Sequence, residues 1–158
     1  MSPFSPASAR QINIGLTVLR AITGLIFVAH GGQKLFVFGL DGVAAAFGQM
    51  GVPLAAVVGP FIALLEFFGG VALIGGLLTR LVAVGLASTM VGAILLVHLA
   101  GGFFMPTGIE FTLSLLGSTI LLALAGAGAY SVDAVIARRR GSSVRLDEAM
   151  QDGTRRAA

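Results

Sequence analysis

The sequence predicts an all-helical (all-α) integral membrane protein built as an antiparallel four-helix bundle. Of its 158 residues, 56% are hydrophobic and 11% are charged, against about 45–50% and 25% in soluble globular domains. Four apolar stretches each approach the ~20 residues that cross a bilayer. Basic residues collect on one side of these stretches. Ordinary soluble, disordered and fibrous classes are therefore excluded.

Apolar runs and turn residues set the bounds of the expected helices. A signal peptide is disfavoured for the first run, because Arg20 interrupts it and no cleavage pattern follows. The segment 31–52 is expected to be a long loop, apolar enough to lie in the membrane interface or re-enter. The four expected spans are 12–29, 53–74, 81–99 and 110–129.

Charge placement divides the chain and predicts its orientation. We expect an N-terminal segment (1–11), a membrane domain (12–133) and a basic, partly disordered tail (134–158). Lys34 alone lies on the side opposite the other loop and tail cations. The positive-inside rule then predicts both termini in the cytoplasm. The cations on that side are Arg10, Arg80, Arg138, Arg139, Arg140, Arg145, Arg155 and Arg156.

The chain contains no cysteine. This excludes disulfides, thiolate metal sites, iron–sulfur ligation and cysteine nucleophiles. Any redox chemistry therefore needs a bound partner. The net charge of +3 reflects the tail rather than a basic nucleic-acid-binding face, so nucleic acid is not an expected partner.

Two charged residues lie within the expected spans. Counted from the cytoplasmic side, Arg20 on the first helix and Glu66 on the second reach nearly the same depth. Because an unpaired charge is costly inside a membrane, they are expected to form an ion pair. The pair would fix helix register; the alternative is a proton relay through Glu66.

A second polar group is expected at the outer face. His30 ends the first helix, His98 ends the third, and Glu110 opens the fourth. Histidine and carboxylate can exchange protons with a quinol while aromatic walls hold its ring, so these three are candidate catalytic residues at a quinone site. The candidate ligand-binding residues around them are Phe27, Gln33, Lys34, Phe103 and Phe111.

Other readings of this outer group stay open. The histidines and Glu110 can simply cap helix ends at the lipid headgroups. An iron site with two histidines and one carboxylate, or a haem between His30 and His98, lacks the usual ligand spacing, so no metal site is predicted.

The residues just described resemble the DoxX family of small four-helix membrane proteins. The ending at 126–133 is similar to the family's Gly-Pro-Gly and Ser-Leu-Asp motifs, with Ala127 and Val132 as departures. The resemblance rests on Leu19-Arg20, Gly24, His30-Gly31-Gly32-Gln33-Lys34-Leu35-Phe36, Glu66, Gly69-Gly70, Gly75, Thr79-Arg80, His98, Gly102-Phe103 and Glu110.

This resemblance implies a multi-pass protein of a bacterial plasma or inner membrane. Members are described as oxidoreductases and associated with quinone-linked redox complexes, which does not make this chain an enzyme. The first hypothesis is a redox-associated subunit that binds quinone or a small aromatic compound, with the bilayer, other redox subunits or a second copy as partners. The alternative is a noncatalytic scaffold or assembly factor. Transport is disfavoured because four helices leave little room for an aqueous path.

Overall fold

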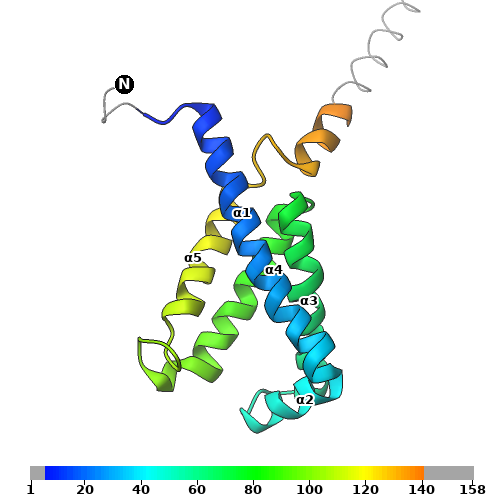
Figure 1. Ribbon diagram of the computed structural model, residues 1–158, viewed down its shortest axis with the longest axis vertical. Coiled ribbons are helices and arrows are strands. Elements are labelled where there is room, and N and C mark those ends of the chain that lie inside the picture. Colours follow the sequence, from blue (N-terminus) through cyan, green and yellow to red (C-terminus); the bar gives the residue numbers. More distant parts are fainter. Residues whose placement is uncertain (1–5, 141–158) are drawn as a thin grey trace, which may run out of the picture.

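The computed structural model describes residues 6–140, and every regular element in that range is a helix (Figure 1). The all-helical prediction is confirmed. A further helix at 132–140 follows the last labelled element. The elements in chain order are α1 (Ala9–Gly32), η1 (Gln33–Phe38), α2 (Gly39–Gln49), α3 (Ala55–Gly75), α4 (Thr79–Ala93), η2 (Ile94–His98), η3 (Leu99–Gly101) and α5 (Glu110–Ala125).

Three helical runs in residues 6–140 are long and apolar enough to cross a membrane. They are Ala9–Gln49, α3 and Thr79–Gly101. The fourth apolar helix, α5, has 16 residues and is shorter than these runs. The membrane-helix prediction is confirmed for three runs, while a fourth span and the antiparallel bundle stay predictions.

The expected first loop, 31–52, is helical over most of its length, and this prediction is wrong. The π-helical turns of η1 continue α1, and α2 follows after a bend at Gly39. Gly39 has a φ of +70°, a backbone region that glycine adopts without steric cost. Only the connection after Gln49 is non-helical, so Lys34 belongs to a helix rather than a loop.

Glycines bring α1 and α3 into backbone contact. A Cβ at Gly24 would lie 2.6 Å from the carbonyl oxygen of Gly70, and one at Gly31 would lie 2.4 Å from the backbone nitrogen of Phe67. Small residues permit such approach, which favours helix association in lipid. Gly31, which together with Gly32 resembles a break in the sequence, is therefore a packing position within a continuous helix.

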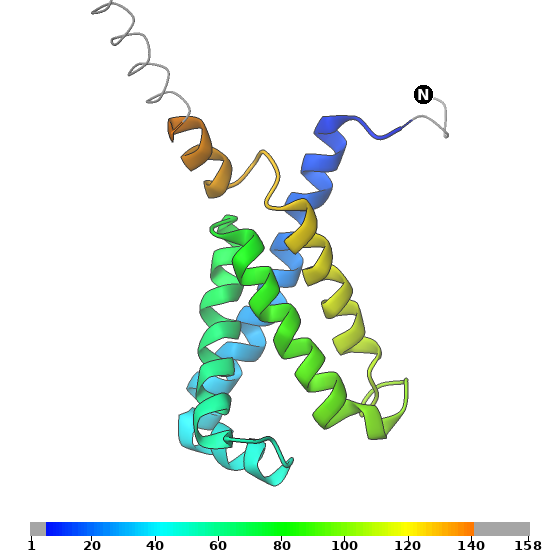
Figure 2. The same cartoon turned by 180° about the vertical axis from the view of Figure 1, so that it is seen from behind.

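The helices form two associated pairs. Most contacts of α1 are with α3, and α4 packs most closely with α5. Figures 1 and 2 show the pairs meeting near the first half of α1 and spreading apart toward α2 and the α4–α5 connection. The core lies at the meeting region, with Phe27, Leu73, Leu86 and Leu122 fully buried.

The start of α1 and the segment after α5 lie at the same end of the structure. The N–H of Ala129 donates to Asn13 Oδ1 at 2.6 Å. The helix begins at Ala9, earlier than predicted, because Ser8 and Gln11 form a reciprocal capping box. Residues 1–5 and 141–158, which include most of the predicted tail, lie outside the described residues.

Candidate functional site

Glu66 is paired with Lys34 and not with Arg20, so the predicted Arg20–Glu66 ion pair is wrong. Lys34 Nζ donates to Glu66 Oε2. The Glu66 side chain is 5% exposed and that of Lys34 is 20% exposed. Axial depth alone predicted Arg20 as the partner of Glu66. The π-helical turns of η1 instead place the Lys34 side chain against α3, in contact with the carboxylate.

Arg20 is buried at the far end of α3. Its Nη1 donates to the carbonyl oxygens of Leu73 (3.2 Å) and Ile74 (2.6 Å), and its Nη2 donates to Tyr130 O. These carbonyls include orphan acceptors of the last turn of α3, where a cation is favoured by the helix dipole. Arg20 therefore ties α1, α3 and the segment after α5 together, a structural role.

At the other end, His98 and Glu110 hold the connection between α4 and α5. His98 Nδ1 lies 3.1 Å from the carbonyl oxygen of Thr107. Glu110 Oε1 accepts a hydrogen bond from the N–H of Met105 at 3.0 Å. Both side chains are half-buried. Their contacts fix the approach to α5, which begins at Glu110.

His30 lies in a different setting from the other two predicted catalytic residues. Its ring packs against Phe111 of α5, with centroids 5.6 Å apart at 47°. The side chain is exposed, and within residues 6–140 neither ring nitrogen makes a hydrogen bond. No cluster of three or more histidine, aspartate or glutamate side chains in that range is placed to hold a metal ion. His30 contacts Phe111, whereas His98 and Glu110 contact the backbone of the α4–α5 connection, so the pocket predicted to join all three stays a prediction.

Phe111 also closes one end of a groove between α1 and α5. The groove has a volume of about 550 Å³ and is mainly apolar, with the hydroxyls of Thr23, Ser114 and Ser118 on its walls. Both serine hydroxyls donate to carbonyls one turn earlier in α5, which leaves their lone pairs free to accept. The other lining residues are Gly15, Val18, Leu19, Ile22, Ile26 and Leu115.

The remaining predicted ligand-binding residues do not converge on this groove. Phe27 is 1% exposed, belongs to the core and does not line the groove. Phe103 is exposed and packs edge-on against Phe104 in the α4–α5 connection. Gln33 is exposed on η1, and Lys34 is engaged by Glu66.

Sequence reasoning missed the groove because it compared only axial levels. The faces that α1 and α5 present to each other depend on the rotation of each helix about its axis, which a count of axial levels does not give. The serines of α5 recur four residues apart at 114 and 118, the spacing that places side chains on one helix face. That spacing was the available signal.

The chain is similar to known membrane proteins along most of its length. The DoxX family model matches residues 15–99. A Bacillus subtilis protein named "Putative oxidoreductase CatD" is 39% identical over 78% of this chain and 88% of its own length. The Escherichia coli "Inner membrane protein YqjF" is 32% identical, covering 80% of this chain and 95% of its own length.

A third relative, from Mycobacterium tuberculosis, is named only as an uncharacterized membrane protein and is 33% identical over 77% of this chain and 80% of its own. No solved structure matches the chain. The family match covers more than half of the residues, and these relatives align along most of their length. The chain therefore belongs to the DoxX family of membrane proteins.

Proposed function

We propose that this protein is a four-span membrane protein with both termini in the cytoplasm, and that it binds a quinone or a similar small aromatic compound between α1 and α5. In this proposal it acts as a redox-associated subunit. The observation that carries the ligand proposal is the His30–Phe111 ring contact at the end of the 550 Å³ groove.

The fourth span in this proposal is α5. Its 16 residues extend about 24 Å at 1.5 Å per residue, against a hydrocarbon thickness of about 30 Å. A short span is accommodated by local thinning of the bilayer. The hydrogen bond between Asn13 and Ala129 supports an even number of crossings, since it joins the start of the first helix to the segment after the last.

The groove suits a quinone in size and chemistry. Ligand sites are typically about 300–1,000 Å³, mostly apolar and supplied with a few polar groups. Apolar side chains of α1 and α5 would line an isoprenoid tail, and Phe111 would lie against the ring. An imidazole N–H of His30 would donate to a quinone carbonyl. The groove is lined by side chains that a membrane-soluble ligand can reach from the bilayer.

The different contacts of the two histidines support different roles for them in this proposal. His30 has ring nitrogens available to a ligand, whereas His98 Nδ1 already meets a backbone carbonyl. Glu110 directly precedes Phe111, and its carboxylate accepts a hydrogen bond from the N–H of Met105. We therefore assign His30 to ligand binding, and His98 and Glu110 to positioning of Phe111 through the connection.

The redox association rests on the name of a relative as well as on the groove. The Bacillus subtilis relative is named "Putative oxidoreductase CatD", and family membership makes a similar role the first one to test here. A bound quinone would supply the electron chemistry, because the chain has no cysteine. The residues of the chain bind the ring, orient it and exchange a proton at the imidazole of His30.

The test is binding of a short-tailed quinone analogue to the purified protein in detergent. His30→Ala should weaken binding by about 1–3 kcal/mol, the cost of one polar partner, or roughly tenfold or more. Gln33→Ala is the matched control, because Gln33 is exposed on η1 and does not line the groove, and it should bind with nearly unchanged affinity. Equal binding by both variants and the unchanged protein would contradict the proposal and favour the scaffold alternative.

A further inference from the structure

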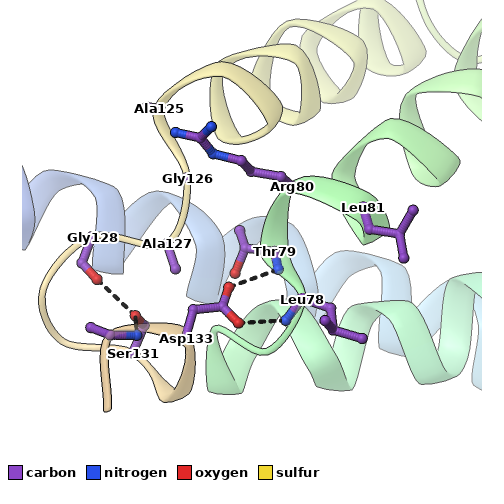
Figure 3. A pocket seen from close by; sticks show the side chains of 11 residues that line it. Leu78, Thr79, Arg80, Leu81, Ala125, Gly126, Ala127, Gly128, Ser131 and Asp133 are labelled. Atoms are coloured by element: carbon purple, nitrogen blue, oxygen red, sulfur yellow. Dashed lines mark hydrogen bonds between the residues drawn. The ribbon is translucent and has the colours of Figure 1, made fainter. Parts of the chain in front are cut away.

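A second cavity lies at the end of the structure that holds the start of α1. It has a volume of about 460 Å³ and is bounded by the start of α4, the end of α5 and the segment that follows α5. Figure 3 shows Arg80 beside Ala125 and Gly126, with Thr79 and Asp133 further along the cavity. None of these residues belongs to the α1–α5 groove.

The acidic member of this cavity, Asp133, is fully engaged. Its Oδ1 accepts from the N–H of Leu78 at 2.7 Å, and its Oδ2 accepts from that of Thr79 at 2.9 Å. Asp133 therefore caps the N-terminus of α4 from a distant part of the chain. It also interacts electrostatically with Arg20. Its negative charge is thus balanced by the helix end and by one arginine.

Arg80 is left as an uncompensated cation. It is exposed, and within residues 6–140 it makes no hydrogen bond or ion pair. Its Nε would lie 3.2 Å from a Cβ at Gly126. The missing side chain at Gly126 therefore leaves the space beside α5 in which the guanidinium lies.

A second polar group in the cavity also has no partner. Thr79 is completely buried, and its Oγ1 makes no hydrogen bond within the described residues. Buried polar atoms in proteins nearly always have a partner, so the orphan hydroxyl in the cavity wall needs a further hydrogen-bond partner, which a ligand atom in the cavity can supply. The cavity thus offers one buried hydroxyl and one free guanidinium.

From this arrangement we propose that the cavity binds a phosphate group, with the guanidinium of Arg80 and the hydroxyl of Thr79 as its ligands. Arginine binds phosphate through two parallel N–H groups, and a threonine hydroxyl can donate a third hydrogen bond. Leu78 and Leu81 are 58% and 70% exposed beside the cavity. These exposed apolar side chains can contact the acyl chains of a bound lipid, which favours a lipid over free phosphate.

The test uses the full chain purified in phosphatidylcholine nanodiscs that contain a titrated fraction of phosphatidylglycerol. Native mass spectrometry counts the lipid retained after release from the disc. The unchanged protein should retain phosphatidylglycerol in preference to phosphatidylcholine, because the phosphate of phosphatidylcholine is already neutralised by the choline cation of the same headgroup. Arg80→Gln should lower that preference about tenfold, the loss expected for one charge-assisted contact. Arg80→Lys should restore part of it, because the charge returns without the planar fork.

Arg10→Gln is the matched control, since it removes a cation at the same end but outside the cavity. It should retain the unchanged protein's preference. Circular dichroism of each variant confirms folding before the comparison. Equal retention by Arg80→Gln and the unchanged protein, with folding intact, would overturn the proposal.

A second arm separates the two sources of phosphate. Inorganic phosphate is added to nanodiscs in which the site has bound phosphatidylglycerol. Displacement at millimolar phosphate assigns the site to the free anion, and failure to displace assigns it to the lipid; both support phosphate recognition. Quinone-analogue binding should be unchanged in Arg80→Gln, so failure of this inference is distinguishable from failure of the proposed function.

Discussion

Removing one member of the Lys34–Glu66 pair should destabilise the protein unequally. Glu66 has a 5% exposed side chain, whereas that of Lys34 is 20% exposed. Lys34→Met leaves the more deeply buried carboxylate without its partner and should cost about 3–5 kcal/mol of unfolding free energy. Glu66→Gln leaves the Lys34 ammonium without its ion-pair partner. The Lys34 side chain is long and more exposed and can turn this group outward, so the change should cost about 1–3 kcal/mol of unfolding free energy.

The double variant tests whether the two residues act on each other. Lys34→Met combined with Glu66→Gln leaves no unpaired charge and should recover about 2 kcal/mol relative to the sum of the single losses. The assay is unfolding of the purified protein by SDS titration from mild detergent, followed by circular dichroism.

A second double-mutant cycle, which combines Arg20→Met with Glu66→Gln, is the control. Arg20 is bound to carbonyls of Leu73, Ile74 and Tyr130 rather than to Glu66. The unfolding free energies lost in Arg20→Met and in Glu66→Gln should therefore add in the double variant within about 0.5 kcal/mol. A larger coupling for Arg20 than for Lys34 would refute the reasoning. So would a Lys34→Met variant as stable as the unchanged protein.

Three further predictions follow from the helix contacts and the chain ends. Gly70→Ala places a Cβ 2.7 Å from a carbonyl oxygen of α1 and should cost about 1–3 kcal/mol of unfolding free energy in SDS. Gly117→Ala, with open space at its Cβ, should cost nothing. Equal stability of the two variants would contradict the close contact of α1 and α3. Asp133→Ala removes the cap of α4 and should cost about 0.5–2 kcal/mol, with no effect expected if the capping geometry is wrong. Reporters fused after Gly51 and Ala158 should lie outside and in the cytoplasm respectively, and an external C-terminus would contradict the topology.

The helices were predictable because hydrocarbon thickness sets their length. The second expected span, 53–74, matches α3 at Ala55–Gly75 closely, since charges and turn residues bound the apolar run on both sides. The first span was drawn too short because Gly31-Gly32 resembles a break. In the structure Gly31 is instead a packing position whose missing Cβ admits α3, and one sequence does not separate those two uses of glycine.

The contacts of polar residues were less predictable from the sequence than their depths along the helix axes. Counting 1.5 Å per residue gives the depth of Arg20 and Glu66 but not the direction in which each points. The π-helical turns of η1 change that direction for Lys34. The Lys34–Glu66 pair, and the capping of α4 by Asp133 from 54 residues away, both depend on tertiary packing that no local pattern records.

Photoaffinity labelling with an azido-quinone tests the central claim, quinone binding between α1 and α5, most directly. The protein is labelled in membranes, digested, and mapped by mass spectrometry with and without excess unlabelled quinone. We expect competed labels on residues 18–26 of α1 and 111–118 of α5, which line the groove, and a loss of these labels in His30→Ala. Competed labels confined to the face between α3 and α4, or no competition anywhere, would contradict the claim.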